Sequence, residues 1–133
     1  MTLNLRVIAP DRTVWDASVE EIILPSSTGQ LGILTNHAPL LTALDIGVMR
    51  LRIDKEWIPI VLMGGFAEIE NNNVQILVNG AETINELNEQ KVQEQLESAL
   101  EMLKSVKTNK QKIEVSQQIR KARARAQALT LSN

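Results

Sequence analysis

The sequence Val74-Gln75-Ile76-Leu77-Val78-Asn79-Gly80 ends the part of the chain that contains glycine and proline. All six glycines and all four prolines lie at or before Gly80, and residues 81–133 contain neither. Glycine and proline interrupt helices and favour tight turns. The sequence therefore predicts a turn-rich, strand-forming first part and an uninterrupted helical second part.

Short strands are predicted throughout residues 1–80. Apolar and polar residues alternate at 3–7 and at 49–53, which is typical of a strand with one buried and one solvent-facing side. Pro10-Asp11 and Asn71-Asn72-Asn73 supply turn signals between such runs. Many short antiparallel strands with one wet face predict a β-sandwich or a flattened barrel of about 80 residues.

Three local features refine this prediction. The strand at 19–24 is expected to end at Pro25, because proline lacks the backbone N–H that a strand donates. The run from Trp57 to Met63 is apolar on both faces and is expected to be interior. Gly64-Gly65 is expected to mark a bulge or a close backbone contact.

The hydrophobic period changes after Leu87, where two apolar stripes follow one another. Both stripes step by four and three residues, as on one face of a helix, and the polar stretch 107–110 separates them. This pattern predicts an antiparallel helical hairpin. Because the stripes are narrow and the second contains two alanines, the hairpin is expected to be marginal alone, to dock on the body or a partner, and to detach. The stripes are Val92, Leu96, Ala99, Leu103 and Val106, then Val115, Ile119, Ala122, Ala126 and Leu129.

Charge is distributed unevenly between the two parts. Residues 1–86 contain five basic and eleven acidic side chains, whereas residues 107–133 contain seven basic and one acidic. A basic helix on an acidic body favours binding to an acidic partner surface. The same basic residues are also compatible with a helix face that is simply exposed to solvent. A free-standing adaptor whose basic hairpin binds nucleic acid or an acidic protein is the alternative hypothesis. No aromatic residue follows Phe66, which weakens the nucleic-acid hypothesis because base stacking needs aromatic rings.

The residues offer no convincing catalytic or metal site. The absence of cysteine excludes thiolate and cysteine-ligated metal chemistry. Asp45 with Glu68 or Glu70 reads as a wet strand face, and Ser26, Ser27 and Thr28 read as turn residues with only His37 available as a base. We therefore expect no enzymatic activity, no metal and no cofactor.

A membrane segment is not expected either. No apolar run approaches the roughly 18 residues that span a bilayer. The first residues, 1–6, read as a strand and not as a signal peptide. Membrane association is therefore expected only through partners.

The apolar segment 29–44 is the sharpest local signal in the chain. Gly29 and Gly32 are expected to allow a close approach of the backbone, and Pro39 favours an extended geometry before it. The single histidine, His37, reads equally well as a contact residue and as a structural histidine.

Three stretches of the sequence stand out together: the run Gly29–Thr42, the run Asp45–Arg50 and the run Met63–Glu68. With the order of strand body and helical hairpin over essentially the full length, they resemble the epsilon subunits of F-type ATP synthases. The opening residues 7–16 resemble the cyanobacterial and plastid branch of the family.

The resemblance implies an α+β chain. Residues 1–86 would form a ten-stranded antiparallel β-sandwich that contacts gamma and the rotor ring, and residues 87–133 would form a regulatory two-helix hairpin. The implied function is that of a non-catalytic central-stalk subunit. It would couple proton translocation to ATP synthesis and inhibit ATP hydrolysis through its C-terminal helices. The implied location is the stromal or cytoplasmic face of a thylakoid membrane, as a peripheral part of the complex in a plastid or cyanobacterium.

The resemblance also implies three protein partners and no nucleic acid. The gamma subunit and the membrane ring of c subunits would be contacted by Ser27, Thr28, Gly29, Gln30, His37, Ala38, Pro39, Leu40 and Leu41. An acidic segment of the beta subunit would be met by the basic residues of the second helix, Arg120, Lys121, Arg123 and Arg125.

One stretch departs from a pattern found in some bacterial members. Those members bind ATP through (Ile/Leu)-Asp-x-x-Arg-Ala at the start of the first helix. The corresponding residues here are Leu87-Asn88-Glu89-Gln90-Lys91-Val92. Without the carboxylate and the guanidinium fork, we expect weak or no ATP binding, which calorimetric titration with Mg-ATP tests.

Overall fold

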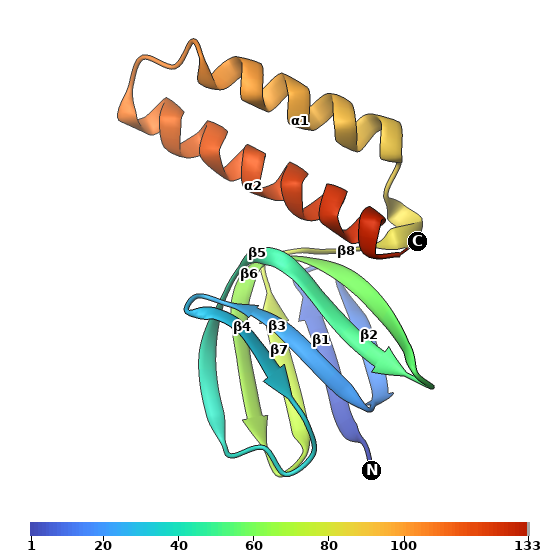
Figure 1. Ribbon diagram of the computed structural model, residues 1–133. Helices are drawn as coiled ribbons and strands as arrows, with labels where there is room; N and C mark the ends of the chain where they lie inside the picture. Colours follow the sequence, from blue (N-terminus) through green and yellow to red (C-terminus); the bar gives the residue numbers. More distant parts are fainter. Residues whose placement is uncertain (133) are drawn as a thin grey trace.

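The computed structural model describes residues 1–132, and Asn133, the last residue of the predicted hairpin, lies outside the described residues. A body of β-strands lies below a pair of antiparallel helices (Figure 1). The strands are β1 (Leu3–Ala9), β2 (Arg12–Val19), β3 (Glu21–Ser26), β4 (Gly29–Ile33), β5 (Leu40–Ile53), β6 (Glu56–Glu70), β7 (Asn73–Val78) and β8 (Ala81–Thr83). A 3₁₀ turn, η1 (Ile84–Glu86), leads into α1 (Glu89–Leu103) and α2 (Asn109–Leu131).

The strands form one connected, strongly curved sheet in the order β2-β1-β7-β6-β5-β3-β4, with β8 paired to β6. The prediction of ten antiparallel strands was wrong in two details. The described residues contain eight strands, and β1 runs parallel to β7, whereas the other pairings are antiparallel.

The lower strand number follows from the length of β5 and β6, which bend without ending. Gly64 and Gly65 in β6 have φ of 82° and 148°, values that glycine adopts readily. The register between the two strands is the same on both sides of this point, from Leu44–Gly65 to Ile46–Met63, and only the pair between them, Asp45 with Gly64, is missing. The predicted close backbone contact is confirmed, because a Cβ on Gly65 would lie 2.0 Å from the carbonyl oxygen of Leu77.

The interior of the body follows the predicted alternation. Leu3, Leu5 and Val7 of β1 point inward, and Met49 and Leu51 of β5 are fully buried. Asn71 and Asn72 form the predicted turn with positive φ, and β6 pairs with β7 across it. One continuous apolar core therefore holds the two sides of the curved sheet together.

Three local expectations need correction. Pro25 does not end the strand but lies within β3. The regular pairing of β3 with β5 is interrupted between Ile23 and Ser26, so no hydrogen bond to β5 is required from the N–H that Pro25 lacks. Trp57 is exposed beside the β5–β6 turn, although the middle of the same run is buried. Gly29 and Gly32 have open space where a Cβ would lie, so no close approach occurs there.

The helical hairpin is confirmed, with boundaries set by capping residues. The side chain of Asn88 accepts a hydrogen bond from the backbone N–H of Lys91, so α1 begins one residue later. Thr108 and Gln111 form a capping box at the start of α2. The connection therefore spans residues 104–108, and Asn109 and Lys110 belong to α2.

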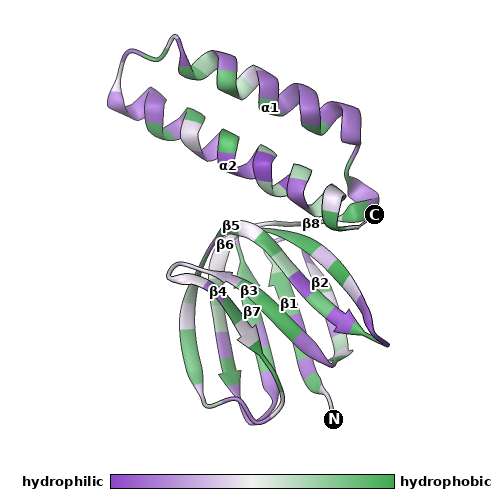
Figure 2. Cartoon of the chain, in the orientation of Figure 1, coloured by the Kyte–Doolittle hydropathy of each residue, from purple (hydrophilic) through white to green (hydrophobic). Residues whose placement is uncertain are grey.

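Helix α2 lies between α1 and the sheet (Figure 1). Its side toward α1 uses the predicted residues Val115 and Ile119, which pack with Ala99. Its other side places Ala124 and Ala128 on Val48 and Val61 of the β5–β6 pair. Figure 2 shows that the helices are mainly hydrophilic, whereas the strands carry most of the hydrophobic residues.

Candidate contact surfaces of the sandwich and the hairpin

The residues predicted to contact the ring and gamma do not form one patch. Ser27, Thr28, Gly29 and Gln30 lie at or beside the β3–β4 turn, whereas 37–41 lie in the loop that precedes β5 and at the start of β5. Strand β4 separates the two groups (Figure 1), and its five residues span roughly 16 Å. The structure therefore places the predicted contact residues in two separate regions of the body.

The β3–β4 turn is held by its own side chains and leaves its tip exposed. The hydroxyl of Ser26, which is buried, donates to the carbonyl of Gly29 at 2.5 Å and lies 3.2 Å from the hydroxyl of Thr28. The ring Nδ1 of His37 lies 2.7 Å from the carbonyl oxygen of its neighbour Ala38. His37 is thus engaged locally and lies at the far end of β4 from Ser27, which rules out a nucleophile–base pair between them.

A group of apolar residues, exposed except for the half-buried Ile8, extends from the second region across the sheet. Ile8 pairs with Leu77, Leu77 with Phe66, and Phe66 with Ala43, so these four form a row across β1, β7, β6 and β5. Leu41 lies two residues from Ala43 on the same side. Leu41, Phe66 and Leu77 are 67%, 57% and 50% exposed. We call this group, Ile8, Leu41, Ala43, Phe66 and Leu77, the apolar sheet face.

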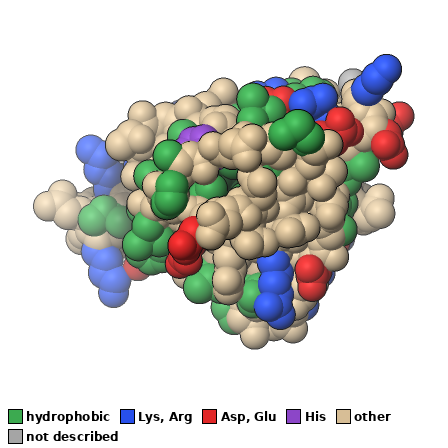
Figure 3. All heavy atoms as spheres, turned by 90° about the horizontal axis from the view of Figure 1, so that it is seen from below, with side chains coloured by type: hydrophobic (Ala, Val, Ile, Leu, Met, Phe, Trp, Pro, Cys, Tyr) green, Lys and Arg blue, Asp and Glu red, His purple; other side chains and the backbone are tan. Residues whose placement is uncertain are grey.

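The loop with His37 borders this face. The backbone N–H of Asn36 donates to the side chain of Asn72, which ties the loop to the β6–β7 turn. Viewed from below, hydrophobic side chains lie near the single histidine (Figure 3). Exposed apolar patches on a soluble protein mark sites of contact.

Sequence reasoning identified Leu41 of the apolar sheet face but missed the contribution of Phe66 and Leu77. A signal was present, because both residues occupy outward positions of strands whose inward positions are already apolar. Ala67 and Ile76 point inward beside them. An apolar residue out of phase with the alternation therefore indicates a contact surface.

The contact between hairpin and body is small and made of short side chains. Ala124 and Ala128 meet Val48 and Val61, with Ile46, Met63, Ile84 and Leu87 at the edges. The two alanines are four residues apart on a side of α2 that the predicted stripe did not include. The alternation of alanine at 122, 124, 126 and 128 is the signal that α2 packs on two sides.

The four basic residues predicted on α2 differ in their surroundings. Arg125 binds Glu82 of β8 through two hydrogen bonds, from Nε to Oε1 at 2.6 Å and from Nη2 to Oε2 at 2.9 Å. Arg120 and Arg123 are exposed and Lys121 is half-buried. Within residues 1–132, none of these three forms an ion pair.

The hydrogen bonds that Arg125 donates to Glu82 raise the pKa of Arg125 above its ordinary value, and this effect exceeds the opposing effect of burial. A base whose pKa is higher in the folded state than in the unfolded state stabilises the folded state. This contribution is complete at a pH below the unfolded-state pKa and is lost only as the pH rises through the folded-state pKa. Since both values lie far above neutrality, titration of Arg125 gives no pH dependence in the physiological range.

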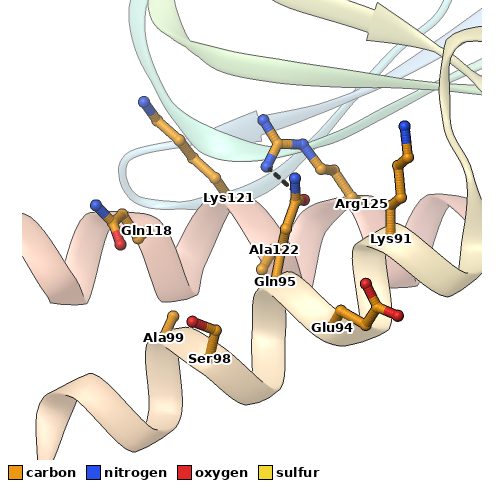
Figure 4. A pocket seen from close by; sticks show the side chains of 9 residues that line it. All are labelled: Lys91, Glu94, Gln95, Ser98, Ala99, Gln118, Lys121, Ala122 and Arg125. Atoms are coloured by element: carbon orange, nitrogen blue, oxygen red, sulfur yellow. Dashed lines mark hydrogen bonds between the residues drawn. The ribbon is translucent and has the colours of Figure 1, made fainter.

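A cleft of 490 Å³ opens between α1 and α2. Figure 4 shows Lys91, Lys121 and Arg125 extending from the two helices toward the same side, with Arg125 also bonded to Gln95 of α1 at 3.4 Å. Asn88 lies next to Lys91, and its side-chain oxygen is used to cap α1. The expectation of weak or no ATP binding at this stretch stays a prediction.

No helix in residues 1–132 is both long and apolar enough to cross a membrane. No group of three or more acidic or histidine side chains in that range is arranged to hold a metal ion.

The sequence matches the family model described as the ATP synthase delta/epsilon chain, β-sandwich domain, over residues 2–84. The chain is 68% identical over 130 residues to the chloroplastic ATP synthase epsilon chain of Pyropia yezoensis, covering 98% of this chain and 97% of the relative. It is 56% identical over 131 residues to the ATP synthase epsilon chain of Thermosynechococcus vestitus, covering 96% and 95% of the two chains.

The fold agrees with solved structures as well. A chain of the Euglena gracilis mitochondrial ATP synthase, in a structure of its OSCP, F1 and c-ring, has a TM-score of 0.86 at 21% identity, over 96% of this chain and 81% of that one. A chain of the Tetrahymena thermophila central stalk and c-ring has a TM-score of 0.64 at 15% identity, over 97% of each chain. The comparisons give no support to a free-standing nucleic-acid adaptor. The chain belongs to the epsilon-chain family of ATP synthases, with chloroplast and cyanobacterial relatives, and is a non-catalytic member of that complex.

Proposed function

We propose that this protein serves as the central-stalk subunit that couples rotation to ATP synthesis and restrains ATP hydrolysis through its helical hairpin. The body (residues 1–86) binds the gamma subunit and the rotor ring. The hairpin (residues 87–133) is the regulatory part. The complex holds the chain at the stromal or cytoplasmic face of a thylakoid membrane.

The observation that carries the proposal is the contrast between the body, which has a continuous apolar core, and the lightly attached hairpin. The hairpin rests on the body through two alanines of α2 and one ion pair. It also presents three basic residues, Arg120, Lys121 and Arg123, that have no acidic partner within residues 1–132. A cationic arm of this kind suits an acidic surface on the catalytic beta subunit.

The body contributes two contact regions to the proposal. The apolar sheet face, together with His37, Ala38, Pro39 and Leu40 beside it, fits the gamma subunit, because exposed apolar rows are buried in stable complexes. The turn at Ser27, Thr28, Gly29 and Gln30 fits the ring of c subunits, because its tip is exposed and held in shape by Ser26.

Truncation separates the two roles. A chain lacking residues 88–133 should raise the ATPase activity of the reconstituted catalytic head, while its affinity for gamma stays within about twofold of the full chain. Unchanged ATPase activity in the presence of bound truncated chain would exclude the hairpin as the inhibitory element.

Charge reversal tests the acidic partner without touching the contact between hairpin and body. The pair Arg120→Glu and Arg123→Glu should weaken inhibition about tenfold or more, because like charges then face each other at the interface. The matched control is Lys110→Glu with Lys112→Glu, which reverses two exposed charges at the start of the same helix. Equal effects of the two pairs would contradict a specific role of the predicted residues.

A further inference from the structure

The structure points to Glu82 as an internal substitute for the acidic partner of the hairpin. We propose that Glu82 holds the hairpin on the body by occupying Arg125, and that an acidic segment of the partner must replace Glu82 at this guanidinium for inhibition to begin. This inference rests on the proposed function and adds its regulation.

The geometry of the pair is that of a specific lock. The guanidinium of Arg125 meets both carboxylate oxygens of Glu82 side-on, at 2.6 and 2.9 Å, and 43 residues separate the two in the sequence. The side chains are 21% and 26% exposed, so solvent screens this pair less than a surface pair. Arg125 also reaches Gln95, so one side chain connects the body, α2 and α1.

Glu82 is firmly attached to the body. It lies in β8 and pairs with Val61 of β6. The adjacent carbonyl of Ala81 accepts a hydrogen bond from Arg12 at 3.1 Å, and Arg12 also binds Glu86 at 2.6 Å. When the hairpin moves away, Glu82 therefore stays behind, and Arg125 leaves with α2.

The ion pair matters because the apolar contact beside it is weak. The buried α2 residues on this side are Ala124 and Ala128, which bury little area and pack against Val48 and Val61. Detaching the hairpin gives up the two charge-assisted hydrogen bonds of this pair and leaves both side chains in water without a charged partner, which costs free energy. A carboxylate on the partner offsets that cost for Arg125. The hairpin therefore detaches when an acidic partner is present to bind Arg125.

The test compares three variants of the full chain, and a fourth as control, with wild type by amide hydrogen exchange of α2. Glu82→Gln keeps the size of the side chain and removes its charge, and we expect exchange in α2 to become about tenfold faster. Arg125→Gln should give a similar increase, and the double variant should add little to either. Glu21→Gln is the matched control, because Glu21 pairs with Arg52 within the body at 2.9 Å and at similar exposure.

Inhibition of the reconstituted catalytic head by the same variants supplies the second readout. Glu82→Gln should inhibit at a several-fold lower concentration than wild type, because the internal competitor is gone. Arg125→Gln should inhibit less well, because the contact with the partner is lost. Opposite signs from the two halves of one ion pair are expected only from competition.

The outcomes separate this inference from the proposed function. Wild-type exchange rates in Glu82→Gln would overturn the lock. Faster exchange with unchanged or weaker inhibition would overturn the competition, while release of ATPase activity by truncation would still support the inhibitory hairpin. If truncation releases no activity, the proposed function fails, and the competition fails with it.

Discussion

The interior of the body and the contact between body and hairpin are built from different kinds of side chain. The first contains fully buried leucine, isoleucine and methionine, among them Leu5, Leu51 and Leu62. The second depends on Ala124, Ala128 and the Arg125–Glu82 pair. Since buried apolar area sets most of the favourable free energy, the two parts should differ strongly in stability. The difference shows how one chain can combine a stable body with a hairpin that detaches at low cost.

The largest effect is expected at the bend of β6. Gly65→Ala places a Cβ 2.0 Å from the carbonyl oxygen of Leu77, at a residue whose φ is 148°. We expect the free energy of unfolding of the body to fall by about 3 kcal/mol or more, measured by urea denaturation. The control Gly32→Ala meets open space in β4 and should stay within about 0.5 kcal/mol of wild type. Equal stability of the two variants would contradict the role given to the bend.

The next effect concerns the hairpin alone. Ala128→Leu overfills a fully buried position between α2 and the sheet, and should weaken docking by about 1–3 kcal/mol. Unfolding of the body, followed by tryptophan fluorescence, should keep its midpoint. Gln127→Leu adds the same side chain at an exposed position of α2 and serves as the control. A fall in body stability as large as the loss of docking would show that the two parts are one cooperative unit.

The smallest of the expected effects concerns binding. Phe66→Ser removes the one aromatic ring of the apolar sheet face. It should weaken binding to gamma about tenfold, with little change in folding because Phe66 is 57% exposed. Titration calorimetry with purified gamma measures this. Trp57→Ser, an exposed apolar residue on the same strand but outside the face, should bind like wild type. An equal loss of affinity for gamma in both variants would contradict the role of the apolar sheet face in binding gamma.

Local patterns in the sequence were enough to predict the strand alternation, the asparagine turn, the Gly65 contact and both helices. These features depend on neighbours close in the chain. The length of β5 and β6 was not predictable, because the bend at Gly64-Gly65 reads equally as a strand end. Pro25 in β3 was missed because the interruption that tolerates it arises from pairing with β5.

The candidate contact surfaces were predictable as residue types and less so as places. The basic residues of α2 were identified, but the partner of Arg125 lies 43 residues away and no local pattern indicates it. Similarly, the cross-strand row of Ile8, Leu77, Phe66 and Ala43 exists only through the register of four strands. The resemblance placed residues 27–30 and 37–41 in one set of contact residues. Only the fold shows that the two groups lie at opposite ends of β4.

Urea unfolding followed by two probes tests the separation of body and hairpin most directly. Both tryptophans, Trp15 and Trp57, lie in the body, whereas the far-ultraviolet signal at about 222 nm comes mainly from α1 and α2. A detached two-helix hairpin has little core of its own and should melt. We predict that the helical signal is lost at clearly lower urea than the change in tryptophan fluorescence. Coincident transitions would mean that the hairpin and the body unfold together, and would contradict the account.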